Sequence, residues 1–338
     1  MLNTSNELKD KLIKLNRILN ENYKLISKID NINIKDFVSK NIGEIKSLCR
    51  IKSNELECFS KEGGILGVDG SKNRMGGAYP HFVEVFQGLA KSSIYQDNPI
   101  YKADFYTPLN LKTEKEIIEK IDKENPAKNE IDSFIRNYKL SSIEVEVAIE
   151  GANKLNPYVI MMDGSLIRYK IECTDKWNEL KSLCEEKGII LIGVIKDIKT
   201  NIIGTSLIEK DILPPNIDNL YDKELLYGLL EYGEMITINK ENTKKYNEGL
   251  RSCFMRTSKD PSVVGMDILK SQEKYMKEMA DLVFTLTPYT SRGVPLWLDI
   301  VDSEVKISDK MMKGLLEKYL DREILEKFFI SERSKRTM

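Results

Sequence analysis

The sequence predicts an α/β fold in which helices flank a mixed β-sheet, with a helical arm at the N-terminus. Two observations predict this class. Short extended stretches punctuated by turn residues come first, as in a hairpin meander. Strand and helix patterns then alternate, which is typical of parallel strands joined by crossover helices. Of the 338 residues, 41% are hydrophobic, enough for the core of one large domain or two small ones.

The chain begins with a predicted helix over residues 5–30. Its leucines recur at the a/d spacing of a coiled-coil seam, at Leu8, Leu12, Leu15 and Leu19. Such a helix either packs on its own domain or pairs two subunits. More helix is expected to about Arg50, and Gly63-Gly64 then break the chain before the first strand.

The remaining elements follow from apolar runs and the residues that punctuate them. Three extended stretches are expected first, at 65–69, about 80–90 and about 99–106. A long helical region is then expected over 112–154, interrupted near Asn125-Pro126. The alternating part is expected as strand 158–163, helix 172–187, strand 189–195, extended stretches near 262–268 and 282–287, and a charged amphipathic helix over 307–330.

This order of elements predicts the domain organisation. A meander that leads into β-α-β units is the order of a ribonuclease H-like mixed sheet. We therefore expect an N-terminal helical arm at 1–60 and a catalytic domain at 61–338, which consists of a ribonuclease H-like core and a C-terminal helix.

Composition excludes several classes of function. Lys and Arg total 52 against 53 Asp and Glu, so the net charge is −1 and no global basic field attracts nucleic acid. The single histidine, His81, excludes any zinc site with two histidines. Five scattered cysteines indicate a reducing compartment, and we expect a cytoplasmic protein without a membrane anchor.

Two apolar stretches each run into the same tripeptide, Asp-Gly-Ser. ILGVDGSKN carries Asp69 and YVIMMDGSL carries Asp163. If the two strands are neighbours, both carboxylates lie at one crevice, where they repel unless a cation sits between them. Hard oxygen ligands of this kind select Mg²⁺ or Mn²⁺. The pattern therefore predicts a shared metal site.

A further ligand is expected from the helix that precedes the Asp163 strand. SSIEVEVAIEG offers three glutamates. Glu146 and Glu150 are four residues apart and share a helix face, whereas Glu144 points elsewhere. The residues alone leave the choice among the three open.

Together these motifs resemble the NurA nucleases. The resemblance rests on GVDGS, the helical glutamate, MDGSL and the G-V-x-K strand GVIK, and it covers roughly residues 60–310. It implies a manganese-dependent deoxyribonuclease, with Mg²⁺ as an alternative ion. It also implies endonuclease activity on single strands, 5′–3′ exonuclease activity, homodimers, and DNA end resection in double-strand break repair with a HerA-type hexameric ATPase.

The resemblance also assigns site residues. Asp69, Glu146, Asp163 and Asp302 match the metal ligands, and Lys196 of GVIK matches a lysine that faces the substrate phosphate. Asp302 competes with Asp299 for the fourth ligand position. Val294 stands before Pro295 where the family usually has tyrosine, so a role for a phenolic hydroxyl there is in doubt.

Two other classes of function are compatible with parts of the pattern. Kinases of the actin and sugar-kinase type hold ATP phosphates on strand-D-x-G-[ST] loops, although GVDGS is one residue short of that spacing. A non-catalytic adaptor of a DNA-translocating ATPase would need no carboxylate set, so the two aspartates count against it.

Overall fold

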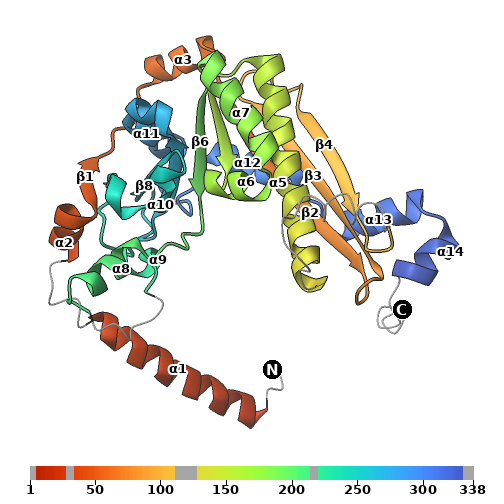
Figure 1. Cartoon of the computed structure of the whole chain (residues 1–338), viewed down its shortest axis with the longest axis horizontal. Helices are drawn as coiled ribbons and strands as arrows, with labels where there is room; N and C mark the ends of the chain where they lie inside the picture. Colours follow the sequence, from red (N-terminus) through yellow and green to blue (C-terminus); the bar gives the residue numbers. More distant parts are fainter. Residues whose placement is uncertain (1–4, 28–33, 111–127, 214–219, 330–338) are drawn as a thin grey trace.

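The computed structural model describes residues 5–27, 34–110, 128–213 and 220–329 (Figure 1). In these residues one nine-stranded sheet forms the centre of the molecule, in the order β1-β7-β8-β9-β6-β5-β2-β3-β4. The strands are β1 (Gly43–Ser47), β2 (Ile65–Gly76), β3 (Phe82–Ser92), β4 (Ile100–Tyr106), β5 (Val159–Asp163), β6 (Ile190–Ile195), β7 (Glu234–Ile238), β8 (Leu250–Met255) and β9 (Val264–Leu269).

Five adjacent strands confirm the predicted ribonuclease H-like mixed sheet. β2, β3 and β4 form an antiparallel meander, while β5 is parallel to β2 and β6 is parallel to β5. The other four strands extend this sheet beyond β6, where β9 pairs with it antiparallel. The predicted meander and the predicted β-α-β units therefore form one continuous layer.

Helices cover both faces of the sheet (Figure 1). Leu66 and Ile160 pack beneath α5 and α7, and their neighbours Ile65 and Val159 pack against α11 and α12, because successive side chains of a strand point to opposite faces. Among the described residues, no helix is long and apolar enough to cross a membrane. The helices are α1 (Asn6–Ser27), α2 (Ile34–Asn41), α3 (Ser53–Lys61), α5 (Lys128–Leu155), α6 (Leu166–Glu172), α7 (Thr174–Lys187), α8 (Ile202–Glu209), α9 (Asp222–Leu225), α10 (Lys244–Asn247), α11 (Met276–Leu286), α12 (Leu296–Val305), α13 (Asp309–Tyr319) and α14 (Arg322–Ile324).

Most predicted elements are confirmed, and three predictions are wrong. The helix expected to about Arg50 gives way to strand β1, which pairs with β7. The extended stretch expected at 282–287 is the end of helix α11. The single helix expected over 307–330 is divided, because Leu320 leaves the helix with φ −105° and ψ 145°. Of the helix expected over 112–154, residues 112–127 lie outside the described residues, and the rest is α5.

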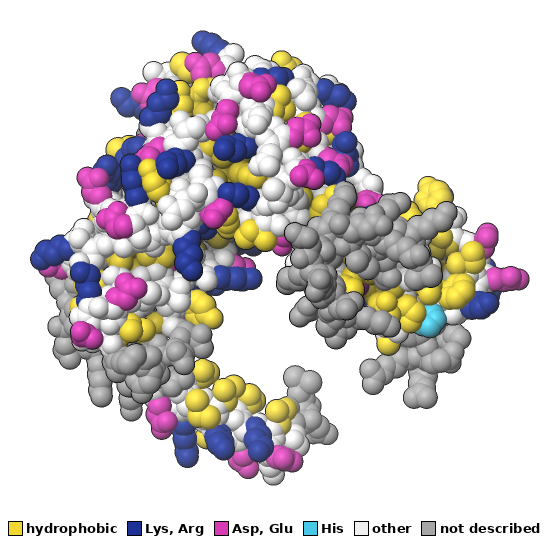
Figure 2. Space-filling view, viewed as in Figure 1, with side chains coloured by type: hydrophobic (Ala, Val, Ile, Leu, Met, Phe, Trp, Pro, Cys, Tyr) yellow, Lys and Arg dark blue, Asp and Glu magenta, His cyan; other side chains and the backbone are white. Residues whose placement is uncertain are grey.

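Helix α1 extends away from the body of the molecule (Figures 1 and 2). The four leucines of its a/d seam are about half exposed, and its apolar side chains lie on the side that faces the hollow beside the rest of the chain. The alternative in which this helix packs on its own domain is therefore not what the structure shows. The division into an arm and a catalytic domain stays a prediction.

Candidate metal centre

The two Asp-Gly-Ser motifs lie side by side on neighbouring parallel strands. The register pairs Val68 with Met162, so the next residue of each strand, Asp69 and Asp163, stands at the same level. β5 ends there, as predicted. β2 does not end at Asp69, because its residues as far as Gly76 continue to pair with β3. Asp69 thus lies within β2, at the level where the parallel strand β5 ends.

Asp302 completes an acidic triad from the opposite end of the chain. It lies on α12, and one carboxylate oxygen from each of Asp69, Asp163 and Asp302 lies within 4.8 Å of the others. Asp299, its rival for this position, accepts a hydrogen bond from Arg292 at 2.6 Å instead. The structure therefore brings together three of the four predicted carboxylate ligands.

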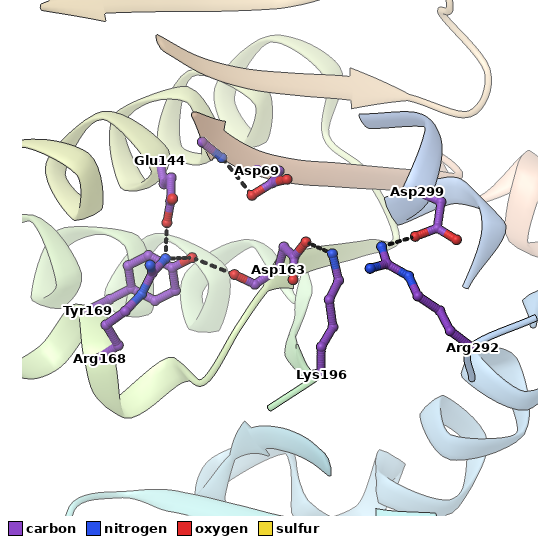
Figure 3. Close-up of polar contacts among 9 residues, drawn as sticks. Asp69, Glu144, Asp163, Arg168, Tyr169, Lys196, Arg292 and Asp299 are labelled. Atoms are coloured by element: carbon purple, nitrogen blue, oxygen red, sulfur yellow. Dashed lines mark hydrogen bonds and ion pairs between the residues drawn. The ribbon is translucent and has the colours of Figure 1, made fainter. Parts of the chain in front are cut away.

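Burial and repulsion from neighbouring carboxylates raise the pKa of Asp69 and of Asp163. Burial, together with the charges of Asp163 and Glu144, raises the pKa of Asp69 to about 9. The pKa of Asp163 is also raised by burial, although Lys196 opposes this shift by donating a hydrogen bond to its Oδ2 (Figure 3). Lys196 of GVIK thus lies beside the triad. Even with this cation, the surroundings on balance raise the pKa of Asp163.

This donor set fits a divalent cation. All three donors are carboxylate oxygens, which are the ligands that Mg²⁺ and Mn²⁺ prefer. The raised pKa of Asp69 is the signature of carboxylates held together in a poorly solvated place without a sufficient counter-charge. A cation bound between them would remove that repulsion.

The helical carboxylate beside the triad is Glu144. Its side chain is only 2% exposed and accepts a hydrogen bond from Arg168, which also donates to the hydroxyl of Tyr169 at 2.8 Å (Figure 3). A methyl group on Gly70 would lie 2.5 Å from Oε1 of Glu144, so the glycine after Asp69 lets α5 approach β2 closely. Burial raises the pKa of Glu144, and the Arg168 cation opposes that shift.

Glu146, the predicted helical ligand, does not lie in this cluster. Its side chain is 32% exposed and pairs with Lys176 of α7, while Lys102 of β4 lies 3.7 Å away. Glu150 lies on the same outer side, where it pairs with Lys154. The geometric part of the prediction was right, since these two glutamates share a face and Glu144 points elsewhere, but the face directed toward the aspartates is the other one.

Two arginines also lie beside the triad, and sequence reasoning missed one of them. Arg292, in the loop before α12, extends toward Asp163 and Lys196 (Figure 3), and its pKa is raised by its bond to Asp299. Its spacing gave no signal, because it reaches the centre through a loop. Arg168 follows the second Asp-Gly-Ser motif, where the sequence makes it a candidate to line the path of the DNA, and it reaches back from α6 to Glu144. Val294, where the family usually has tyrosine, is buried.

Comparison with known proteins gives one family. The model of the NurA domain matches residues 63–307, which include the triad, Glu144 and Lys196. No curated protein matches the sequence significantly.

Solved structures agree with this match. The NurA nuclease from Sulfolobus solfataricus is 14% identical to this chain, and the match covers 96% of this chain and 98% of that chain. The TM-score is 0.57, so the two share a fold. Endonuclease V from Bacillus subtilis is 13% identical and covers 86% of this chain and 94% of its own, with a TM-score of 0.37. Human endonuclease V is 12% identical, covers 85% and 98%, and has a TM-score of 0.40. Likenesses as weak as these last two do not assign a fold.

Proposed function

The chain belongs to the NurA family, and from this premise we propose that it is a metal-dependent nuclease that hydrolyses phosphodiester bonds of DNA. One observation carries the proposal: Asp69, Asp163 and Asp302 converge from two strands and a helix, with an oxygen of each within 4.8 Å of the others. Such a set suits phosphoryl chemistry, in which positioning and charge stabilisation do most of the work.

Each residue of the centre has a role in this proposal. The triad would hold the ions, Mn²⁺ or Mg²⁺, and these would supply Lewis-acid chemistry and lower the pKa of the attacking water. Glu144 takes the part first predicted for Glu146, since it is the helical carboxylate beside Asp69. Lys196 and Arg292 present their cations on the side of Asp163 away from Glu144, where they would orient the scissile phosphate. Contacts to phosphate carry no sequence information, so we expect cleavage at many sequences.

Family membership favours the nuclease over the phosphotransferase that shares its sheet. A non-catalytic adaptor would have no use for a buried carboxylate whose pKa is raised to about 9, because that charge destabilises the folded chain above its unfolded pKa.

We extend the proposal to the setting of the reaction. A net charge of −1 gives little long-range attraction to DNA, so an ATPase that delivers the strand would compensate. We therefore propose, with the family resemblance, that a HerA-type hexameric ATPase is the partner, that α1 joins two copies, and that the complex resects DNA ends in the cytoplasm. All five cysteines are free in the described part of the chain, in agreement with a reducing compartment.

The test is digestion of single-stranded oligonucleotides labelled at the 5′ or the 3′ end, with Mn²⁺, Mg²⁺, Ca²⁺ or a chelator. We expect cutting with Mn²⁺ or Mg²⁺ and none with the chelator. Comparison of the two labels separates exonuclease from endonuclease action and gives the polarity. A folded protein that cuts nothing with any ion contradicts the proposal.

A further inference from the structure

A cavity of about 480 Å³ opens beside the metal centre. It shares Asp163, Arg168 and Lys196 with that centre and continues between the end of β6, helices α6 and α10, and strand β8. Its volume is in the range of sites that hold one small organic ligand. The roles assigned above to the metal centre do not use this space.

The walls of the cavity are mostly apolar. Ile167 of α6, Ile195 of β6, Ile198, Ile202 of α8 and Phe254 of β8 line it. The ring of Phe254 is the kind of surface on which an unpaired base stacks without regard to sequence, and the isoleucines add apolar contact.

Its floor is a buried polar cluster. Asp267 is fully buried, and both of its oxygens accept hydrogen bonds from Lys245 at 2.8 Å. The hydroxyls of Ser252 and Ser165 donate to Asp267 at 2.7 and 2.6 Å, so the buried charge is satisfied. Lys245, Ser165, Ser252 and Asp267 all line the cavity. The hydroxyl oxygens of Ser165 and Ser252 keep acceptor lone pairs, so this polar cluster can accept hydrogen bonds from a ligand.

Cations stand where the cavity meets the metal centre. Lys196 contacts Asp163 there, Arg168 contacts Glu144, and Lys199 is exposed on the rim. The cavity therefore combines cations, apolar walls and hydrogen-bonding groups beside the metal centre. These are the kinds of partner that the phosphate, the base faces and the base edge of a nucleotide need.

We propose that this cavity, the nucleotide pocket, holds one unpaired nucleotide of the strand, next to the phosphate that is cut. The inference rests on the proposed nuclease function and adds a substrate requirement to it. The nucleotide must be unpaired and unstacked, so a duplex is a substrate only where it opens. The base would lie against the apolar walls with its edge toward the hydroxyl oxygens of Ser165 and Ser252.

The first test measures binding with a chelator, so that cleavage plays no part. Short single strands carry 2-aminopurine, a fluorescent base, at successive positions and are titrated at low salt with the protein. Ile167→Glu places a carboxylate in the pocket, and Ile171→Glu places the same charge one turn further along α6, where the side chain is 70% exposed. We expect wild type and Ile171→Glu to change the emission at one position, and Ile167→Glu to bind about tenfold more weakly without that change. Identical titrations for all three proteins would overturn the pocket.

A further titration with a free 2-aminopurine nucleotide tests whether the pocket binds a DNA strand or a mononucleotide. If the free nucleotide shows the Ile167-dependent signal and the strand does not, the pocket serves a small molecule and the strand proposal is wrong. Ile202→Glu enters the pocket from the start of α8 and replaces Ile167→Glu should that variant not fold.

The second test needs only the wild-type protein. A series of strands carries one abasic site at successive positions and is digested with Mn²⁺. We expect cutting to fall about tenfold at the bond whose neighbouring base is missing. Equal cutting throughout the series would overturn the pocket and leave the nuclease intact, whereas no cutting of any strand would overturn the nuclease itself.

Discussion

At the scale of single residues, the surroundings of Asp69 change the chemistry of its carboxyl group. Its pKa is raised to about 9 by burial, Asp163 and Glu144, while in the unfolded chain it is near 4. Between these values the folded chain keeps a proton that the unfolded chain releases. The metal-free protein therefore loses stability as pH rises from about 4 to 9.

Asp69→Asn removes this dependence. We expect the metal-free variant to melt higher than wild type at pH 8, to approach it at pH 5, and to cut at least about a hundredfold more slowly at any pH. Thermal melting with a chelator measures the first effect, and exposed Asp97→Asn is the control. Melting temperatures of wild type and Asp69→Asn that fall in parallel with pH would show that Asp69 does not carry the shifted proton.

Glu144 and Glu146 are two positions apart on α5, and our proposal gives them different roles. We expect Glu144→Gln to slow cutting at least about tenfold, because a buried group beside the metal ligands changes. Glu146→Gln should leave the rate within about twofold, since a partly exposed ion pair contributes little. Rates are compared at saturating Mn²⁺ after circular dichroism has shown that both variants fold. The reverse ranking would return the ligand role to Glu146.

At the scale of elements, one carboxylate holds the start of α8. Asp222 is fully buried and accepts hydrogen bonds from the amides of Ile202 and Ile203, at 3.0 and 2.8 Å, and from the hydroxyl of Thr200 at 2.6 Å. These amides are among the helix donors that lack partners within the helix. A residue twenty positions later in the chain therefore caps α8.

We expect Asp222→Ala to lower the free energy of unfolding by about 1–3 kcal/mol, because buried donors lose their acceptor. Asp222→Asn keeps one acceptor oxygen and should lose less. Urea denaturation gives both values, and the affinity for metal should not change. An alanine variant as stable as wild type would mean that other acceptors satisfy the amides of α8.

Elements with a strong local pattern could be predicted, and elements defined by distant partners could not. β5 and β6 are apolar runs between turn residues and were found within a residue or two. β1 has the sequence GEIKS, with little apolar pattern, and it is a strand because β7 pairs with it from about 190 residues away. Residues 282–287 are apolar enough for a strand, but Met279, Ala280 and Val283 give them a helical face toward the core.

The same distinction holds for the metal centre. Asp69, Asp163 and Lys196 could be predicted because each stands at or beside the end of an apolar run. The choice of Glu144 depends on how α5 rotates as it packs on β2 and β3, which spacing within one helix does not determine. The position of Arg292 depends on the path of a loop. Asp267 lies in the strand VGMDIL, where a single charged residue among apolar ones gave no signal of a site.

At the scale of the whole molecule, α1 exposes an apolar seam. Its seam leucines are about half exposed, and a second copy of α1 would bury them in a coiled coil. We expect deletion of residues 1–30 to lower the oligomeric state and to spare metal-dependent cutting of short strands. Leu19→Glu should act like the deletion, whereas Asn20→Glu adds the same charge at a neighbouring exposed position off the seam and should not.

Light scattering and digestion of the same preparations test this. A truncated protein with the same number of subunits as wild type would show that α1 does not join subunits. One that folds but no longer cuts would place α1 in the active site.

The acidic triad also sets an order of events in the life of each molecule. Its members are residues 69, 163 and 302, so α12 supplies the last of them to be synthesised. A nascent chain therefore carries no complete centre until α12 has left the ribosome. If the triad is the site of cutting, nearby nucleic acid is safe from this protein until then, and a chain truncated before α12 is harmless.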